Sequence, residues 1–287
     1  AATAATAARD EHDERVDKYA KLLKLGLPKA AVERKMAADG VEPALLASVR
    51  DGAPSASDAD AKHEPSGVYC GCIGARFERP GRMEWRTMLV TEEQNTAANG
   101  YGADADPDLA ATQLLRAWAT FFGRAHLPTH EEVARDATGR YVEVWRPGAG
   151  RAWLDADAYT ARMEAVAAPF FAEANARADA AGTPAHCRVV GLGLGAWQID
   201  SAQRPLLREA FARALRAVAP RHIAEVEFIY FAESSTADDA ACGGVRHGEE
   251  LTCGGAVRIT FSRGDPAAPV PAGRLLVAMY AWDSNAY

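Results

Sequence analysis

A glycine-rich segment at residues 191–197 has the composition of a turn that binds an anion. It reads Gly-Leu-Gly-Leu-Gly-Ala-Trp, follows the apolar pair Val189–Val190, and precedes a helical pattern at 205–218. Glycines after a strand let the backbone approach a ligand closely, and free amides at the start of the next helix favour an anion. The spacing is G-x-G-x-G, which does not match the G-x-G-x-x-G dinucleotide fingerprint. The alternative interpretation is a tight strand exit with glycines packed under a helix.

A second candidate binding segment begins at Asn95 and ends at Gly102. It contains Asn99, Gly100 and Tyr101 and follows a predicted strand at 83–91. An asparagine side chain both donates and accepts hydrogen bonds, which suits ribose hydroxyls or a base edge. The alternative is an ordinary Asn-Gly turn, which requires a positive φ angle.

Polar residues also follow the last predicted strand, at Asp283 and Asn285. They would lie near other strand ends if that strand runs parallel to its neighbour, and otherwise they form a polar C-terminal turn.

Cys70 and Cys72 are too close together for the usual zinc spacing. Cys242, His247 and Cys253 share one predicted loop, where a metal site is the alternative to ordinary loop cysteines, but no fourth spaced ligand accompanies them. We expect no metal and no cofactor, and the sequence assigns no catalytic residue.

The overall composition excludes several classes of partner. The 287 residues are 48% hydrophobic and carry a net charge of −7. Binding of nucleic acid or of anionic membranes depends on excess lysine and arginine, so neither partner is expected. No apolar run reaches the roughly 18 residues of a transmembrane helix. Sparse cysteines without a disulfide pattern indicate a reducing compartment, and we expect a cytoplasmic protein.

The order of predicted elements favours an α/β protein. Helical patterns at 109–122, 129–139, 157–181 and 205–218 alternate with strand-like runs at 68–77, 83–91, 141–145, 189–190, 223–231, 256–261 and 274–281. This alternation predicts a three-layer arrangement, a mixed sheet flanked by helices. The last two strands follow each other without a helix and could pair as a hairpin-like edge. We predict an N-terminal helical appendage at 1–50, a linker at 51–65 and the α/β domain at 66–287.

The two glycine segments together resemble those of macrodomain proteins. Asn95 with Gly100 and Gly102 is similar to their distal-ribose loop, and residues 191–197 are similar to their diphosphate loop and to a stretch of bacterial poly(ADP-ribose) glycohydrolases. The resemblance implies a macrodomain-like fold that binds an ADP-ribose-like nucleotide diphosphate in one cleft between the two loops.

In that interpretation phosphate is held by the amides of Gly191, Gly193, Gly195 and Ala196. Asn95 holds the ribose, and Trp197 or Tyr101 walls the site. Glycohydrolases of this kind have adjacent glutamates after a glycine run, whereas Glu92 and Glu93 precede Asn95 here. The sequence therefore leaves binding and hydrolysis both open.

Four segments resemble an uncharacterised family of protists and intracellular bacteria, a domain of unknown function. They are residues 74–78, 94–102, 191–197 and 281–285. This resemblance implies that the four segments belong to one fold and supplies no activity.

The N-terminal region resembles a different kind of protein. Residues 19–46 contain two short amphipathic patterns joined by Gly26-Leu27-Pro28, and they are similar to a motif in the coiled-coil subunit of the WASH complex. Two such helices are too small to form a core alone. The alternative function is therefore a cytoskeleton-associated interaction module that binds a protein partner through residues 16–46.

Overall fold

The computed structural model describes residue 36 and residues 64–282, except 78, 147–149, 196 and 232–240. The chain divides into two compact units, residues 1–61 and 62–287. Apart from residue 36 of the predicted helical appendage and residues 64–65 of the predicted linker, both segments lie outside the described residues. The predicted domain boundaries stay a prediction, and the fold below is that of the second unit.

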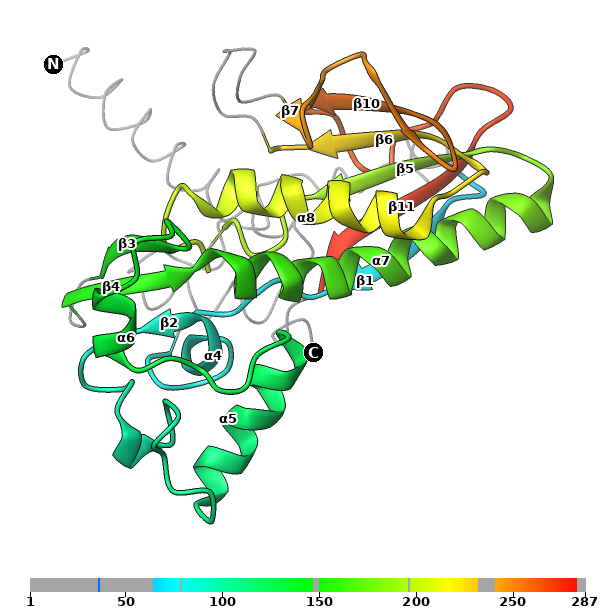
Figure 1. Cartoon of the computed structure of the whole chain (residues 1–287). Coiled ribbons are helices and arrows are strands. Elements are labelled where there is room, and N and C mark those ends of the chain that lie inside the picture. The colour runs from blue at the N-terminus through cyan, green and yellow to red at the C-terminus, as the bar shows by residue number, and fades with distance from the viewer. Residues whose placement is uncertain are drawn as a thin grey trace, which may run out of the picture. The chain divides into compact units, whose positions relative to one another are not determined.

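A six-stranded sheet forms the centre of the second unit (Figure 1). Five strands run parallel, and the edge strand β9 runs antiparallel to β10. The order across the sheet is β1 (Val68–Cys72), β11 (Leu275–Ala281), β5 (Ala185–Val190), β6 (Ile223–Ile229), β10 (Gly255–Ser262) and β9 (Glu250–Cys253). The predicted α/β class, a mixed sheet flanked by helices, is confirmed.

Two long helices, α7 (Ala156–Ala181) and α8 (Gln203–Val218), lie side by side against one face of this sheet (Figure 1). Successive side chains of a strand point to opposite faces, so Cys187 and Val189 of β5 enter the core on the helix side. A series of ring contacts joins Phe171 of α7, Phe211 of α8 and Phe228 of β6. Burial of these aromatic side chains supplies much of the hydrophobic stabilisation.

The opposite face of β5 and β6 is polar. His186 Nε2 and Arg188 Nε both contact Oε2 of Glu227, at 2.9 and 2.8 Å. The Arg188 guanidinium also donates to the carbonyls of Pro266, Ala268 and Pro269. These bonds hold the connection between β10 and β11 against the sheet.

That connection corrects one prediction. The strands β10 and β11 do not pair as a hairpin, because β10 pairs with β6 and β11 pairs with β5, both in parallel. Parallel strands need a crossover of about a dozen residues, and residues 263–274 are long enough to provide one.

A smaller antiparallel sheet lies between β1 and α7 in the sequence. Its order is β2 (Leu89–Val90), β4 (Gly150–Asp155) and β3 (Tyr141–Arg146). Three helices and one 3-10 turn accompany it: α4 (Trp85–Met88), η2 (Ala97–Asn99), α5 (Ala110–Phe121) and α6 (His130–Ala134). Asp155, the last residue of β4, connects the smaller sheet to α7. Its carboxylate caps α7 and accepts hydrogen bonds from Arg124 and Arg140.

Several predicted elements differ from the observed ones. The run at 83–91 forms the helical turn α4 followed by the short strand β2, because Trp85, Thr87 and Met88 are all buried and do not alternate. Strand β4 was not predicted. Proline usually breaks or bends a helix, so the sequence predicts a break or bend at Pro169 in the pattern at 157–181, but α7 continues through it as one helix. The stretch between the predicted strands at 223–231 and 256–261, for which no element was predicted, contains a small hairpin, β7 (Ala241–Cys242) and β8 (Val245–Arg246), as well as β9.

Candidate functional site

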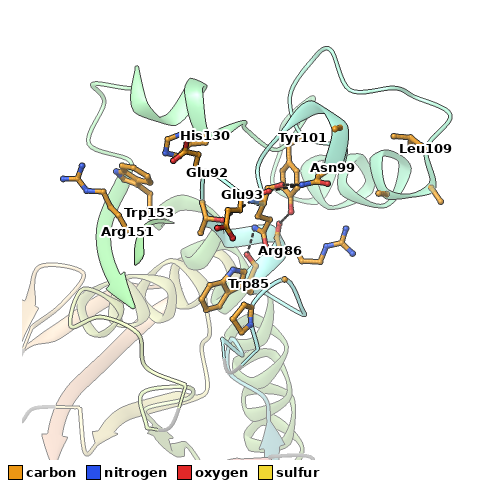
Figure 2. A pocket seen from close by; sticks show the side chains of 17 residues that line it. Trp85, Arg86, Glu92, Glu93, Asn99, Tyr101, Leu109, His130, Arg151 and Trp153 are labelled. Carbon is orange, nitrogen blue, oxygen red and sulfur yellow. Dashed lines mark hydrogen bonds between the residues drawn. The ribbon is translucent and has the colours of Figure 1, made fainter. Parts of the chain in front are cut away.

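A cavity of about 1100 Å³ opens between the smaller sheet and the start of α5 (Figure 2). Ligand pockets in proteins have volumes of roughly 300–1,000 Å³, so this one accommodates a nucleotide-sized molecule. The side chains used below come from α4, the loop after β2, η2, α6 and β4: Trp85, Arg86, Glu92, Glu93, Asn99, Tyr101, His130, Arg151 and Trp153.

Two adjacent carboxylates, Glu92 and Glu93, line the cavity (Figure 2). They directly follow Thr91, which is buried, and both side chains are exposed. The loop that carries them is fixed by Gln94, whose amide donates to the carbonyl of Leu89 at 2.9 Å. The site therefore presents two solvent-accessible acids on a positioned loop.

Cationic and aromatic groups share the same cavity. Arg86 and Arg151 are the two arginines among its lining residues. The guanidinium of Arg151 lies over the Trp153 ring at 5.7 Å, and the His130 ring meets Trp153 edge-on at 5.0 Å. Trp85, only 3% exposed, packs into the main core. Arginines suit phosphate groups, and indole rings offer stacking surfaces for a base.

Asn95, predicted to hold ribose, is buried in its own loop. Its Oδ1 accepts from the amide of Thr91 and from Gln94 Nε2, both at 3.1 Å, and its Nδ2 donates to the carbonyl of Pro128 at 3.0 Å. It is not among the residues that line the cavity. These bonds position the acidic loop relative to the start of α6.

Asn99 and Tyr101 line the cavity, and their role in binding a ligand stays a prediction. The two glycines beside them pack tightly. Burial raises the pKa of the Tyr101 phenol, whose hydroxyl donates to the Arg86 carbonyl at 2.8 Å. Gly100 has φ +95°, and a Cβ there would lie 2.8 Å from the amide nitrogen of Thr112. Gly102 has φ +84° and would place a Cβ 2.6 Å from Thr129 Cγ2.

The second glycine segment follows β5 and packs against the segment after β1. Gly193 has φ +74°, and a Cβ there would lie 3.0 Å from the Ala75 carbonyl oxygen. A Cβ at Gly74 would lie 2.5 Å from the Gly193 nitrogen, so the two backbones are in close contact. The Arg76 guanidinium lies over the Trp197 ring at 4.9 Å.

The cavity and the second glycine segment contact the same stretch of chain, residues 74–85. Gly74 and Ala75 contact the glycine segment, while Pro80, Gly81 and Trp85 line the cavity. Gly191, Gly193, Gly195 and Trp197 do not line it. Ala196, Asp283 and Asn285 lie outside the described residues. The single cleft between two glycine loops therefore stays a prediction.

The described residues contain neither a candidate metal site nor a candidate membrane-spanning helix. Over those residues, no group of three or more His, Cys, Asp or Glu side chains is placed to hold a metal ion. None of the described helices has both the length and the apolar character needed to cross a bilayer.

Residues 48–287 match the model of the MavL-like ADP-ribosylhydrolase family. The chain belongs to this family. It is 34% identical over 233 residues to the ADP-ribosylarginine hydrolase CG3568 of Drosophila melanogaster, and 30% identical over 238 residues to the ADP-ribosylarginine hydrolase CG2909 of the same species. Each match covers 78% of this chain and 44% of the relative, so the chain spans less than half the length of these proteins.

The N-terminal residues 1–47 match a separate model, that of subunit CCDC53 of the WASH complex. The resemblances inferred from the sequence are thus confirmed in part. The family matched by residues 48–287 is named for ADP-ribosyl hydrolysis. The uncharacterised family that the sequence resembled had supplied no activity. Whether the fold is macrodomain-like stays a prediction.

Sequence reasoning missed most of the cavity. Trp85 was placed in a strand, and Arg151 and Trp153 lie on β4, which was not predicted. The adjacent glutamates were visible in the sequence, but only the fold brings β4 to face them.

Proposed function

We propose that this chain hydrolyses the bond between ADP-ribose and an arginine side chain, in the cavity beside β2 and β4. The observation that carries the proposal is the pair Glu92 and Glu93 in a nucleotide-sized cavity that also contains arginines and indole rings. Membership of the ADP-ribosylhydrolase family supports it, as do the two relatives named ADP-ribosylarginine hydrolases.

The polar and aromatic residues of the cavity suit the parts of ADP-ribose. Arg86 and Arg151 supply positive charge for the diphosphate, since the planar guanidinium matches phosphate geometry. Trp153, which is half-buried, offers a ring face or edge for the adenine, and the buried Trp85 forms part of the cavity wall. The side-chain nitrogen of Asn99 donates to the carbonyls of Glu93 and Gln94, and its Oδ1 can accept a hydrogen bond from a ribose hydroxyl.

The acidic pair suits the hydrolytic step. One carboxylate takes a proton from water as the water oxygen forms a bond to the anomeric carbon of the ribose. The bond from that carbon to the arginine nitrogen breaks, its electron pair leaves with the guanidine, and the protonated carboxyl group gives its proton to that guanidine. The second carboxylate stabilises the positive charge that develops on the ribose, as in glycoside hydrolysis. The products are ADP-ribose and unmodified arginine.

The predicted phosphate loop remains part of the proposal as a second ligand contact. Gly191, Gly193 and Gly195 follow β5, and ligands of α/β sheets bind beyond the carboxyl ends of parallel strands. Trp197→Ala tests this contact. We expect weaker ADP-ribose binding if the loop reaches the ligand, and unchanged binding removes the loop from the site.

Calorimetric titration with ADP-ribose and a turnover assay test the function. We expect saturable heat on titration, and release of ADP-ribose from ADP-ribosylated arginine. Folded protein that gives no heat at millimolar ADP-ribose and releases no product would contradict the proposal.

We also propose that residues 16–46 bind a helical partner, because residues 1–47 match a subunit of the WASH complex. Amphipathic helices that lack a core of their own commonly dock into a groove or onto a partner helix. Affinity capture with the full chain and with a chain lacking residues 1–47 tests this. Identical sets of captured proteins would reject it.

A further inference from the structure

The outer side of α5 carries apolar side chains that are exposed to solvent. Leu114 and Phe121 are each 50% exposed, and Leu109, the residue before the helix, is 40% exposed. Residues at i, i+4 and i+7 share one side of a helix, so Leu114, Trp118 and Phe121 form a continuous stripe. We name Leu109, Leu114, Trp118 and Phe121 the α5 apolar surface.

A hollow lies within this surface. A cavity of about 430 Å³ is lined by Ala117, Trp118 and Phe121 of α5 and by Arg162 and Ala165 of α7. Its cation, Arg162, is paired with Glu84 at 3.1 Å. Because Glu84 balances the charge of Arg162, this apolar hollow suits an aliphatic or aromatic side chain of another protein.

The α5 apolar surface starts at the rim of the proposed substrate cavity. Leu109, Ala110 and Ala111 line that cavity, and the 12 residues of α5 then extend over about 18 Å. A polypeptide whose modified arginine enters the cavity has to pass the cavity rim, and α5 supplies part of that rim. The stripe therefore lies on the helix whose first residues form part of the cavity rim.

We propose that the α5 apolar surface docks the protein that carries the ADP-ribosylated arginine, through an apolar patch next to the modified residue. The inference rests on the proposed hydrolase function. An apolar partner surface fits better than a charged one, because Arg116 is the one charged residue of α5 and its guanidinium donates to the Ala105 carbonyl. Large exposed apolar patches mark sites of protein contact.

The test compares two substrates on the full chain: free ADP-ribosylated arginine and an arginine-ADP-ribosylated protein. Leu114→Ser and Ala117→Glu disrupt the stripe and the hollow, whereas Thr120→Ala alters an exposed position of the same helix as a control. We expect KM for the protein substrate to rise about tenfold in both test variants, and KM for the free compound to stay unchanged. Thermal unfolding checks that each variant folds. If Ala117→Glu does not fold, the comparison of the two substrates with Leu114→Ser alone decides the test.

Each other outcome has a distinct meaning. Equal changes in KM for both substrates would overturn the docking inference, because the surface would then only support the cavity. Unchanged KM values would overturn it too, and a simultaneous loss of self-association in sedimentation would assign the surface to a second copy of the chain. Wild-type protein that hydrolyses neither substrate would reject the hydrolase function, and the docking inference with it.

Discussion

Glu92 and Glu93 are adjacent in the sequence and share the cavity, so their separate roles need separate substitutions. We expect Glu92→Gln or Glu93→Gln to lower kcat by about 10²–10⁴-fold, because the amide can neither take a proton nor carry negative charge. The measurement is release of ADP-ribose from ADP-ribosylated arginine. Glu131→Gln, an exposed residue of α6 that does not line the cavity, is the control. Wild-type rates in both variants would exclude the acidic pair from catalysis.

Glu227 gives a prediction about stability and pH. Its hydrogen bond with His186 lowers the pKa of this carboxyl from 4.5 to about 2 despite burial, with help from Ser262 and Arg188. A folded-state pKa below the unfolded value stabilises the protein above about pH 4.5, and this stabilisation is lost as the pH falls toward 2. A shift of this size corresponds to about 3 kcal/mol.

We therefore expect Glu227→Gln to lower the free energy of unfolding by about 3 kcal/mol at pH 7, and by less at pH 3. Denaturant unfolding at the two pH values measures the difference. The exposed pair Glu209–Arg213 supplies the control, since Glu209→Gln should cost under about 1 kcal/mol. A loss for Glu227→Gln that is the same at both pH values would contradict the assignment.

At the scale of elements, sequence periodicity predicted the long helices better than the short strands. Helix α5 and helix α8 begin and end within about two residues of their predicted bounds, because their buried residues recur at helical spacing over several turns. Strand β4 escaped prediction since its burial pattern does not alternate. The pairing of β10 with β6 depends on contacts far apart in sequence, which no local pattern encodes.

In the candidate site too, residues with a local sequence signal were predicted, and residues placed by long-range strand pairing were not. Asn99 and Tyr101 were predicted, because an Asn-Gly turn after an apolar run is a local signal. Arg151 and Trp153 reach the cavity only because β4 pairs with β2, where Val90 faces Trp153. Asn95 was predicted to hold a ribose, whereas its side chain bonds to Thr91, Gln94 and Pro128, contacts that could not be predicted from the loop alone.

The glycines of the segment after β5 differ in what they tolerate. Gly193→Ala places a side chain at φ +74° and 3.0 Å from the Ala75 carbonyl, so we expect a loss of about 1–2 kcal/mol in unfolding free energy. Gly195→Ala is the matched control, since a Cβ there meets nothing within 4 Å. Midpoints of denaturant unfolding measure both variants. Equal midpoints would mean that Gly193 has no packing role.

At the scale of the whole molecule, the two candidate functions map to different compact units. Every residue that lines the proposed substrate cavity lies in the unit at 62–287. We expect a chain without residues 1–47 to keep kcat/KM for free ADP-ribosylated arginine while losing the captured protein partner. A turnover assay on both forms measures this. Lost turnover in a folded truncated chain would show that the N-terminal unit contributes to the site.

Strand β11 lies between β1 and β5 in the sheet, and this position has a consequence for biosynthesis. Val68 pairs with Val277, so β1 emerges from the ribosome long before its partner in β11 exists. Pairing between such distant segments is slow, and an unpaired strand edge promotes aggregation. Among the described strands β1 pairs with β11 alone, so a nascent chain halted before residue 275 would leave β1 without a partner and one flank of β5 unpaired, which we expect chaperones and proteases to recognise.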